Sequence, residues 1–128
     1  GVIDGINLVE LLAKINVRIE KLLDKDHQIG HAFFMSVASK VDLDRVFENK
    51  IIPLLQEYFY GDYGKIGLVL GESFIELENQ KSDFAPFKHY DDSIKRDYQD
   101  KKSFKFTSKE NWNYESIYSL KLDVSNNE

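Results

Sequence analysis

The sequence predicts a mainly α-helical protein with a small β element near its C-terminus. Two long segments repeat their apolar residues at three- and four-residue steps, which is the period of a helix. One late segment instead alternates apolar and polar residues, which is typical of a strand. With 128 residues and no cysteine, the chain is long enough to bury a core without disulfide bonds.

The first helix is expected over residues 7–23. Its apolar stripe consists of Leu8, Leu11, Leu12, Ile15, Ile19, Leu22 and Leu23. Asn7 followed by Glu10 three positions later has the spacing of a capping box. The stripe lasts about two heptads, so packing in a local bundle is favoured over a coiled coil.

The second long helix is expected over residues 42–59, with Asp42 able to cap its start. Pro53 lies inside this segment, and proline removes one backbone donor while its ring crowds the carbonyl of Asn49. A kink or a break is therefore expected at Pro53. Before this helix, the apolar stretch 31–40 predicts a short buried helix or turn.

A third, short helix is expected after Gly61, where Asp62 can cap its start and Gly71 can end it. Residues 103–108, SFKFTS, alternate like a strand. Residues 112–122 fit either a strand or a helix beginning at Asn113, and their alternation favours a strand in a small hairpin or sheet against the helices.

Two polar segments complete the organisation expected for the second half of the chain. The charged run 91–102 is expected to be a solvated loop or an exposed helix. The closing residues 123–128 are expected to fray. The change of character after Gly71 predicts a boundary between residues 1–72 and residues 73–128.

Composition limits the function classes. A net charge of −5 at pH 7 argues against this chain being the main surface that binds a phosphate backbone, so any role on DNA would come from another part of a larger protein. No apolar run approaches the length of a membrane span, and the first residues lack the layout of a signal peptide. These features favour a cytoplasmic protein without a membrane partner.

Residues 26–31, DHQIGH, place two histidines four positions apart, close to a zinc-protease signature. That signature needs a glutamate as the general base, but Gln28 stands in its place, and Gly30 costs about 1 kcal/mol inside a helix. The third histidine, His89, is far along the chain. We therefore expect no metal site here. The alternative is that His27 and His31 pack against a helix junction or cap it.

The sequence contains no phosphate-binding loop, no nucleophile elbow and no cysteine nucleophile. Paired carboxylates such as Asp42 with Asp44 and Asp91 with Asp92 fall at expected caps or in polar loops, so they are expected to be surface residues. No catalytic residue is therefore assigned, and the residues alone indicate a helical domain with a β-rich tail.

Two blocks of sequence resemble the C-terminal end of the AAA+ module in McrB-type proteins, the nucleotide-hydrolysing subunits of 5-methylcytosine-specific restriction systems. The blocks are INVRIEKLLDKDHQIGHAFF and VFENKIIPLLQEYFYGDYGKIGLVLGE, and the resemblance covers residues 5–72. The matching positions are Arg18, Ile19, Glu20, Leu22, Leu23, Asp24, Asp26, His27, Ile29, Gly30, His31, residues 49–59, Asp62, Lys65, Ile66, Leu70 and Gly71. The later residues resemble the family only loosely, around 112–118.

The resemblance implies that residues 1–72 are an AAA+ helical lid and that residues 73–128 are a C-terminal extension. It further implies that the turn after the first helix approaches nucleotide at the subunit interface. The implied contacts are Lys25, His27, Gln28, Ile29, Gly30 and His31. Gly30 would let the backbone come close to a ligand, and a helix starting near His31 would present free N–H groups. Phe33 and Phe34 stand where many AAA+ lids carry a sensor arginine.

For the intact protein, the resemblance implies GTP or ATP with Mg²⁺, and no cofactor is expected for this chain alone. Its implied partners are the other subunits of a ring, with a hexamer expected, and a McrC-type endonuclease subunit. DNA would be reached through domains outside this chain. The alternative function is a non-enzymatic helical module that binds a partner protein through its aromatic-rich tail.

Overall fold

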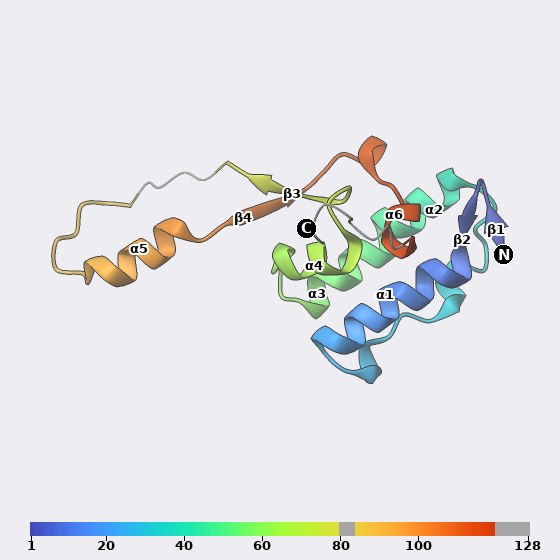
Figure 1. The fold of residues 1–128 in the computed structure, drawn as a ribbon, viewed down its shortest axis with the longest axis horizontal. Helices are drawn as coiled ribbons and strands as arrows, with labels where there is room; N and C mark the ends of the chain where they lie inside the picture. Colours follow the sequence, from blue (N-terminus) through green and yellow to red (C-terminus); the bar gives the residue numbers. More distant parts are fainter. Residues whose placement is uncertain (80–83, 120–128) are drawn as a thin grey trace, which may run out of the picture.

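A helical body carries a protruding arm in the computed structural model, which describes residues 1–79 and 84–119 (Figure 1). The body contains the N-terminal hairpin, the helices that follow it and the last described helix. The arm is formed by one antiparallel strand pair, with a helix at its far end. The expected fold class, mainly α with a small β element, is confirmed.

The N-terminus forms a hairpin of two short strands, β1 (Val2–Ile3) and β2 (Ile6–Asn7). This hairpin was not predicted from the sequence. Asp4 and Gly5 make its tight turn with φ values of 47° and 81°, the left-handed conformation that such turns require. The hairpin leads directly into α1 (Leu8–Leu22), which confirms the first predicted helix.

Asn7 caps α1 as predicted, because its side-chain oxygen accepts a hydrogen bond from the Glu10 N–H at 3.1 Å. A full capping box would also need the Glu10 side chain to reach the Asn7 N–H. That N–H instead donates to the hydroxyl of Tyr118 at 2.9 Å. The start of α1 is therefore completed by a residue from the other end of the described chain.

The second predicted helix is a continuous helical segment in three parts. They are α2 (Lys40–Val46), a wide π turn called η3 (Phe47–Ile51) and α3 (Ile52–Tyr58). The start predicted at Asp42 is wrong: Ser39 is the cap, because its hydroxyl accepts from the Asp42 N–H at 3.2 Å. Ser39 can do so because its backbone is extended, while the Asp42 carboxylate accepts from the Ala38 N–H at 3.0 Å.

The disturbance expected at Pro53 takes the form of the π turn, and the chain remains helical on both sides of it. The N–H of Ile52 bonds to the carbonyl of Phe47, five residues earlier, which is the spacing of a π-helix. Proline has no N–H to give and crowds the preceding turn. A wider turn just before Pro53 relieves this crowding without ending the helix.

The third predicted helix is confirmed as α4 (Tyr63–Leu70). Asp62 caps its start by accepting from the Lys65 N–H at 3.2 Å, and Gly71 ends it with a φ of +90°. Between α1 and α2, the chain makes two single-turn 3₁₀ helices, η1 (Lys25–His27) and η2 (His31–Phe34). The second of these is the short helix expected in the stretch 31–40, but only its Phe34 is buried.

The arm begins after α4. Its strands β3 (Ile75–Glu78) and β4 (Ser103–Phe106) pair antiparallel, with Ile75 opposite Phe106, and both strands contact α4. This confirms the strand predicted in SFKFTS. Its partner is Ile75–Glu78, which was not predicted as a strand, and not the segment 112–122 that was expected to join the hairpin or sheet. The charged run is largely helical, as α5 (Asp92–Asp100), and none of the α5 residues is buried.

The strand favoured over residues 112–122 is wrong within the part that the structure describes. A 3₁₀ turn, η4 (Lys109–Asn111), and then a four-residue helix, α6 (Glu115–Tyr118), occupy it. Asn113 caps α6 by accepting from the Ser116 N–H at 3.2 Å. Alternation suggested a strand because the buried Trp112 and Tyr114 are two residues apart. Leu120, Leu122 and the end expected to fray lie outside the described residues.

One hydrophobic cluster runs through the body. Phe47 lies at its aromatic centre, with ring centroids 5.7 Å from Phe74 and 4.8 Å from Tyr114. Trp112 stacks on Phe74 at 5.1 Å. The core therefore contains residues from both sides of the proposed 72/73 boundary, and the boundary itself stays a prediction. Over the described ranges, every helix is too short or too polar to cross a lipid bilayer.

Candidate functional site

The turn between α1 and η2 carries all six residues that the resemblance implicates, and Asp24 organises its first half. Asp24 lies in extended conformation just after α1, and its carboxylate accepts from the Asp26 N–H at 2.9 Å, which starts η1. The same carboxylate oxygen lies 2.6 Å from Nδ1 of His27. This hydrogen bond is the main reason why the pKa of Asp24 is lowered from its ordinary value.

His27 is fixed between two neighbours. Asp24 holds its Nδ1, and its ring meets the Tyr58 ring edge to face, with centroids 4.9 Å apart and an interplanar angle of 88°. Tyr58 is the last residue of α3, so His27 joins the turn to the second helical segment. This geometry fits the alternative in which His27 packs at a helix junction.

Asn16 fixes the middle of the turn. Its side-chain carbonyl accepts from the Ile29 N–H at 2.6 Å, and its amide donates to the Ile29 carbonyl at 2.9 Å. The amide thus pairs with both backbone groups of Ile29 in the manner of a neighbouring strand. The Ile29 side chain is 2% exposed, so this residue belongs to the core.

Glu20 engages two of the implicated polar side chains from α1. Gln28 Nε2 donates to one of its carboxylate oxygens at 3.2 Å, and Lys25 Nζ lies 4.0 Å from the other. The Lys25 side chain is 83% exposed, so this ion pair is weak and the ammonium remains available to solvent. Gln28 and Lys25 therefore share an acidic partner on α1.

Gly30 and His31 form the open end of the turn. A Cβ placed on Gly30 would meet no atom within 4 Å, and its φ of −77° is one that any residue adopts. The glycine is therefore not required by the backbone angle, but it leaves open space beside the peptide. His31 is exposed and makes no hydrogen bond to any side chain that the structure describes.

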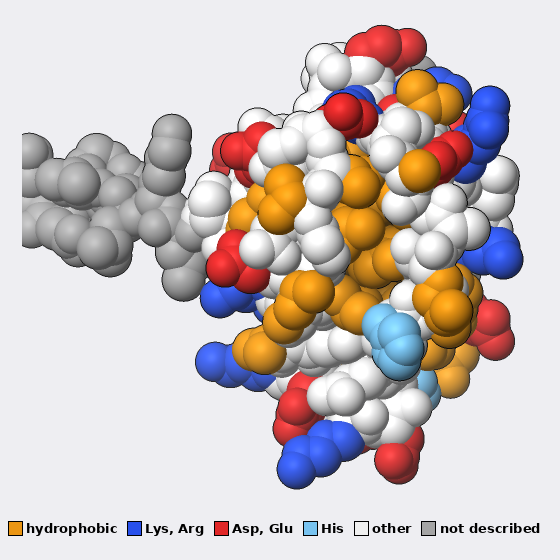
Figure 2. Space-filling model, turned by 90° about the vertical axis from the view of Figure 1, so that its right-hand side faces the viewer, with side chains coloured by type: hydrophobic (Ala, Val, Ile, Leu, Met, Phe, Trp, Pro, Cys, Tyr) orange, Lys and Arg blue, Asp and Glu red, His pale blue; other side chains and the backbone are white. Residues whose placement is uncertain are grey.

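His31 borders a shallow apolar groove of about 410 Å³ between α1 and η2. Its other lining residues are Gly1, Leu8, Val9, Leu12, Ala13, Asn16, Phe34 and Met35. Figure 2 shows apolar side chains gathered around a histidine on the face of the molecule that carries the N-terminus. Phe34 is 7% exposed and stacks on Phe47, so it anchors η2 in the core and supplies no charge to this face.

The structure separates the two histidines. His27 faces Tyr58 and Asp24, whereas His31 lies at the groove beside the first turns of α1. Across the ranges 1–79 and 84–119, no three histidine or carboxylate side chains cluster as a metal ion would need. The helix that starts at His31 is a 3₁₀ helix of four residues, so its dipole is small. Gly30 has open space beside its peptide, and His31 borders the groove.

Comparison with known families identifies the region that contains this turn. The model of the McrB alpha-helical lid domain family matches residues 7–67. Residues 7–67 are a McrB-type lid region. The match begins at the cap of α1 and ends within α4, so the McrB-type lid comprises the helices that surround the turn. No curated protein and no solved structure matches the chain.

The sequence reading of the McrB-type lid missed Asn16, although it ties α1 to the turn. A signal was present, because asparagine is unfavourable inside helices and Asn16 stands next to the apolar stripe, between Ile15 and Ile19. Such a residue inside a helix indicates that the side chain serves a backbone elsewhere. The position of that backbone, 13 residues later, follows only from the fold.

Proposed function

We propose that this chain is the lid of a McrB-like AAA+ NTPase and that it closes over nucleotide at the interface between ring subunits. The observation that carries the proposal is the match of residues 7–67 to the McrB lid domain. The open space at Gly30 and the imidazole of His31, which bonds to no described side chain, support nucleotide contact at that end of the turn. His27, Gln28, Lys25 and Ile29 position this end through their bonds within the lid.

In this proposal, nucleotide hydrolysis belongs to the intact protein and drives modification-dependent DNA restriction in the cytoplasm. GTP or ATP with Mg²⁺ is the proposed nucleotide, a hexameric ring is the proposed assembly and a McrC-type endonuclease subunit is the proposed partner. DNA recognition is assigned to domains outside this chain. The lid contributes a rigid, mostly apolar surface with one imidazole, so it supplies positioning and closure rather than a nucleophile.

The test is steady-state hydrolysis of GTP and of ATP by the AAA+ protein that contains this lid, with and without His31→Ala. A lost hydrogen bond to a charged phosphate costs about 1.5–3 kcal/mol, so the substitution is expected to raise the nucleotide KM about tenfold or more. His89→Ala is the matched control, because His89 lies on the arm and far from the turn in sequence. Thermal unfolding of each variant verifies that the lid stays folded.

Three outcomes separate the parts of this proposal. An increase in KM for His31→Ala but not for His89→Ala supports nucleotide contact by the turn. Equal kinetics for both variants would show that His31 is structural while the lid assignment stands. Absence of hydrolysis and of nucleotide binding by the intact protein would contradict the NTPase proposal itself.

A second candidate function, a protein-interaction module, is favoured by the arm. Its far end exposes several aromatic side chains and contains no buried α5 residue. Exposed aromatic clusters of this kind are enriched at protein interfaces. This function is compatible with the first, because the arm and the turn are different surfaces.

A further inference from the structure

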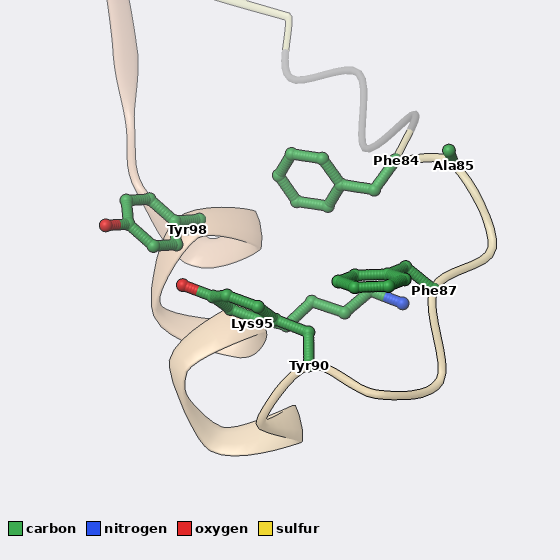
Figure 3. A pocket seen from close by; sticks show the side chains of 6 residues that line it. All are labelled: Phe84, Ala85, Phe87, Tyr90, Lys95 and Tyr98. Atoms are coloured by element: carbon green, nitrogen blue, oxygen red, sulfur yellow. The ribbon is translucent and has the colours of Figure 1, made fainter.

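The arm ends in an aromatic hollow that the other described residues leave uncovered. The hollow encloses about 320 Å³ and is lined by Phe84, Ala85, Phe87, Tyr90, Lys95 and Tyr98, which we call the aromatic cup. Figure 3 shows the four rings arranged around a common space, with the phenylalanines and Tyr90 on the loop and Tyr98 on α5. An apolar surface of this kind on a projecting arm marks an interaction site.

Exposure of these rings is high. Phe84 is 52% exposed, Phe87 61% and Tyr98 59%. Since α5 has nine residues and buries none of them, the helix is too short to be stable through its own hydrogen bonds. An aromatic side chain that fills the cup would therefore order the arm and bury part of its exposed apolar surface.

The same chain presents such a side chain on the loop between α3 and α4. Tyr60 is 96% exposed and has a φ of +51°, a left-handed conformation that is unfavourable for tyrosine. Its backbone is held there by a hydrogen bond from the Tyr60 N–H to Glu57 and by one from Gly61 to Gln56. These two bonds are those of a Schellman motif, which ends α3 and leaves the Tyr60 ring in solvent.

Opposite charges lie beside Tyr60 and beside the cup, although Lys102 also borders the hollow next to Tyr60. Glu57 and Asp62 flank Tyr60, are both exposed, and make no ion pair with any residue in the described ranges. Lys95 at the cup likewise has no carboxylate partner among the described residues. An ammonium at the rim of an aromatic cup favours a ring that arrives with acidic neighbours, as Tyr60 does.

We propose that Tyr60 of one copy of this chain inserts into the aromatic cup of a second copy, with Lys95 facing Glu57 or Asp62 across the contact. Tyr60 does not line the cup of its own chain. Within its own chain it borders a different hollow, with Lys102 and Ser103, at the base of the arm. The two halves of the contact are different surfaces, so the interface is heterologous. Repetition of a heterologous interface produces a ring or an open chain of subunits.

This inference goes beyond the proposed lid function and does not depend on nucleotide. Its test is sedimentation velocity of the 128-residue protein over a series of concentrations without nucleotide. The wild type is expected to associate as concentration rises. Tyr60→Ala and Phe87→Ala are each expected to weaken association at least tenfold, since aromatic anchors carry much of an interface's energy. Val17→Ala, an exposed site on α1, is the control and is expected to behave as wild type.

Mixing the variants makes the test specific. Tyr60→Ala keeps its cup and Phe87→Ala keeps its tyrosine, so an equimolar mixture has one working contact and is expected to stop at a 1:1 dimer. Tyr98→Ala serves as a second cup variant, and circular dichroism shows whether either substitution unfolds the protein.

A wild type that stays monomeric at all concentrations would overturn the inference. The same result is expected if the cup binds another protein or a single-stranded nucleic acid instead of a second copy. Association that survives both Tyr60→Ala and the two cup variants would overturn it as well. A mixture that forms no dimer although the unmixed wild type associates would show that the contact is not between these two surfaces.

Discussion

The hydroxyl of Tyr118 accepts a hydrogen bond from the backbone N–H of Asn7 at 2.9 Å, which joins α6 to the start of α1 across 111 residues. That N–H belongs to the cap of α1, and the usual capping box would have satisfied it with Glu10. The end of the described chain thus completes the first helix of the lid. Stability of the lid is expected to depend on a residue outside the segment 7–67 that matches its family.

Tyr118→Phe tests this dependence. The substitution removes the acceptor and leaves the ring, so it is expected to lower the free energy of unfolding by about 1 kcal/mol. Urea unfolding followed by the fluorescence of the single tryptophan, Trp112, measures the change. Tyr98→Phe is the control, because its hydroxyl lies on the exposed arm. Equal midpoints for the two variants would show that the Tyr118 bond contributes no net stability.

Arg18 makes the second long-range connection in the lid. Its Nη1 donates to the carbonyl of Val69 at 2.8 Å, in the last turn of α4, where helix carbonyls lack partners of their own. Partial burial of the guanidinium lowers its pKa from the ordinary value. The positive charge also suits the negative end of the α4 dipole.

Arg18→Met is expected to lower the free energy of unfolding by about 1–2 kcal/mol, because the donor is lost while the apolar stem is kept. Arg45→Met is the matched control, since Arg45 is an exposed residue near the end of α2. Thermal unfolding of both variants under the same conditions measures the difference. A destabilisation by Arg45→Met as large as that by Arg18→Met would contradict a specific role for the bond to Val69.

Periodicity predicted the helices of the lid because each has a long apolar stripe, as the Leu8-to-Leu23 series shows. It failed at α6 because a four-residue helix has no period to read, and its position is set by tertiary contacts such as the burial of Ile117. The cap at Ser39 was missed because Ser39 and Asp42 are both good caps, and only the extended backbone of Ser39 decides between them.

The candidate site was predicted as a segment but not as an arrangement. A resemblance over residues 26–31 identified the turn, yet no local pattern shows that His27 faces Tyr58 or that Asn16 pairs with Ile29. These contacts join residues 13 to 31 positions apart, so they follow only once the helices are packed. For the same reason the sequence could not relate the exposed Tyr60 to the aromatic cup.

The pair formed by the buried Tyr114 and the partly buried Asp44 predicts an asymmetry between two substitutions. The Tyr114 hydroxyl donates to Asp44 Oδ1 at 2.5 Å, and Lys40 lies 3.5 Å from the other carboxylate oxygen. Burial, followed by the hydrogen bond to Asp44 and by its charge, raises the pKa of Tyr114 above its ordinary range. The phenol therefore stays protonated and needs an acceptor inside the core.

Asp44→Ala is expected to lower the free energy of unfolding by about 2–3 kcal/mol, because it leaves the buried Tyr114 hydroxyl without a partner. Tyr114→Phe is expected to cost about 1 kcal/mol or less, since the freed carboxylate still meets Lys40 and water. Urea unfolding of the two single variants and of the double variant measures the coupling. The idea fails if Tyr114→Phe is the more damaging of the two.

The contact between His27 and Asp24 predicts a change in acid titration. The hydrogen bond from His27 is the largest cause that lowers the pKa of Asp24, so His27→Ala is expected to return that pKa toward about 3.9. NMR titration of the Asp24 carboxyl carbon measures the shift. Asp91 is the internal control, because its pKa is lowered mainly by the hydrogen bond from Ser93 and should not move.

The same contact fixes the sign of a stability change. A carboxyl whose pKa is lower in the folded than in the unfolded protein contributes stability above the unfolded value of about 3.9, and this contribution disappears as pH falls through the folded value. The free energy of unfolding of wild type is therefore expected to fall more steeply below pH ~4 than that of His27→Ala. Parallel acid profiles, together with an unmoved Asp24 titration, would show that the 2.6 Å contact does not hold the turn in solution.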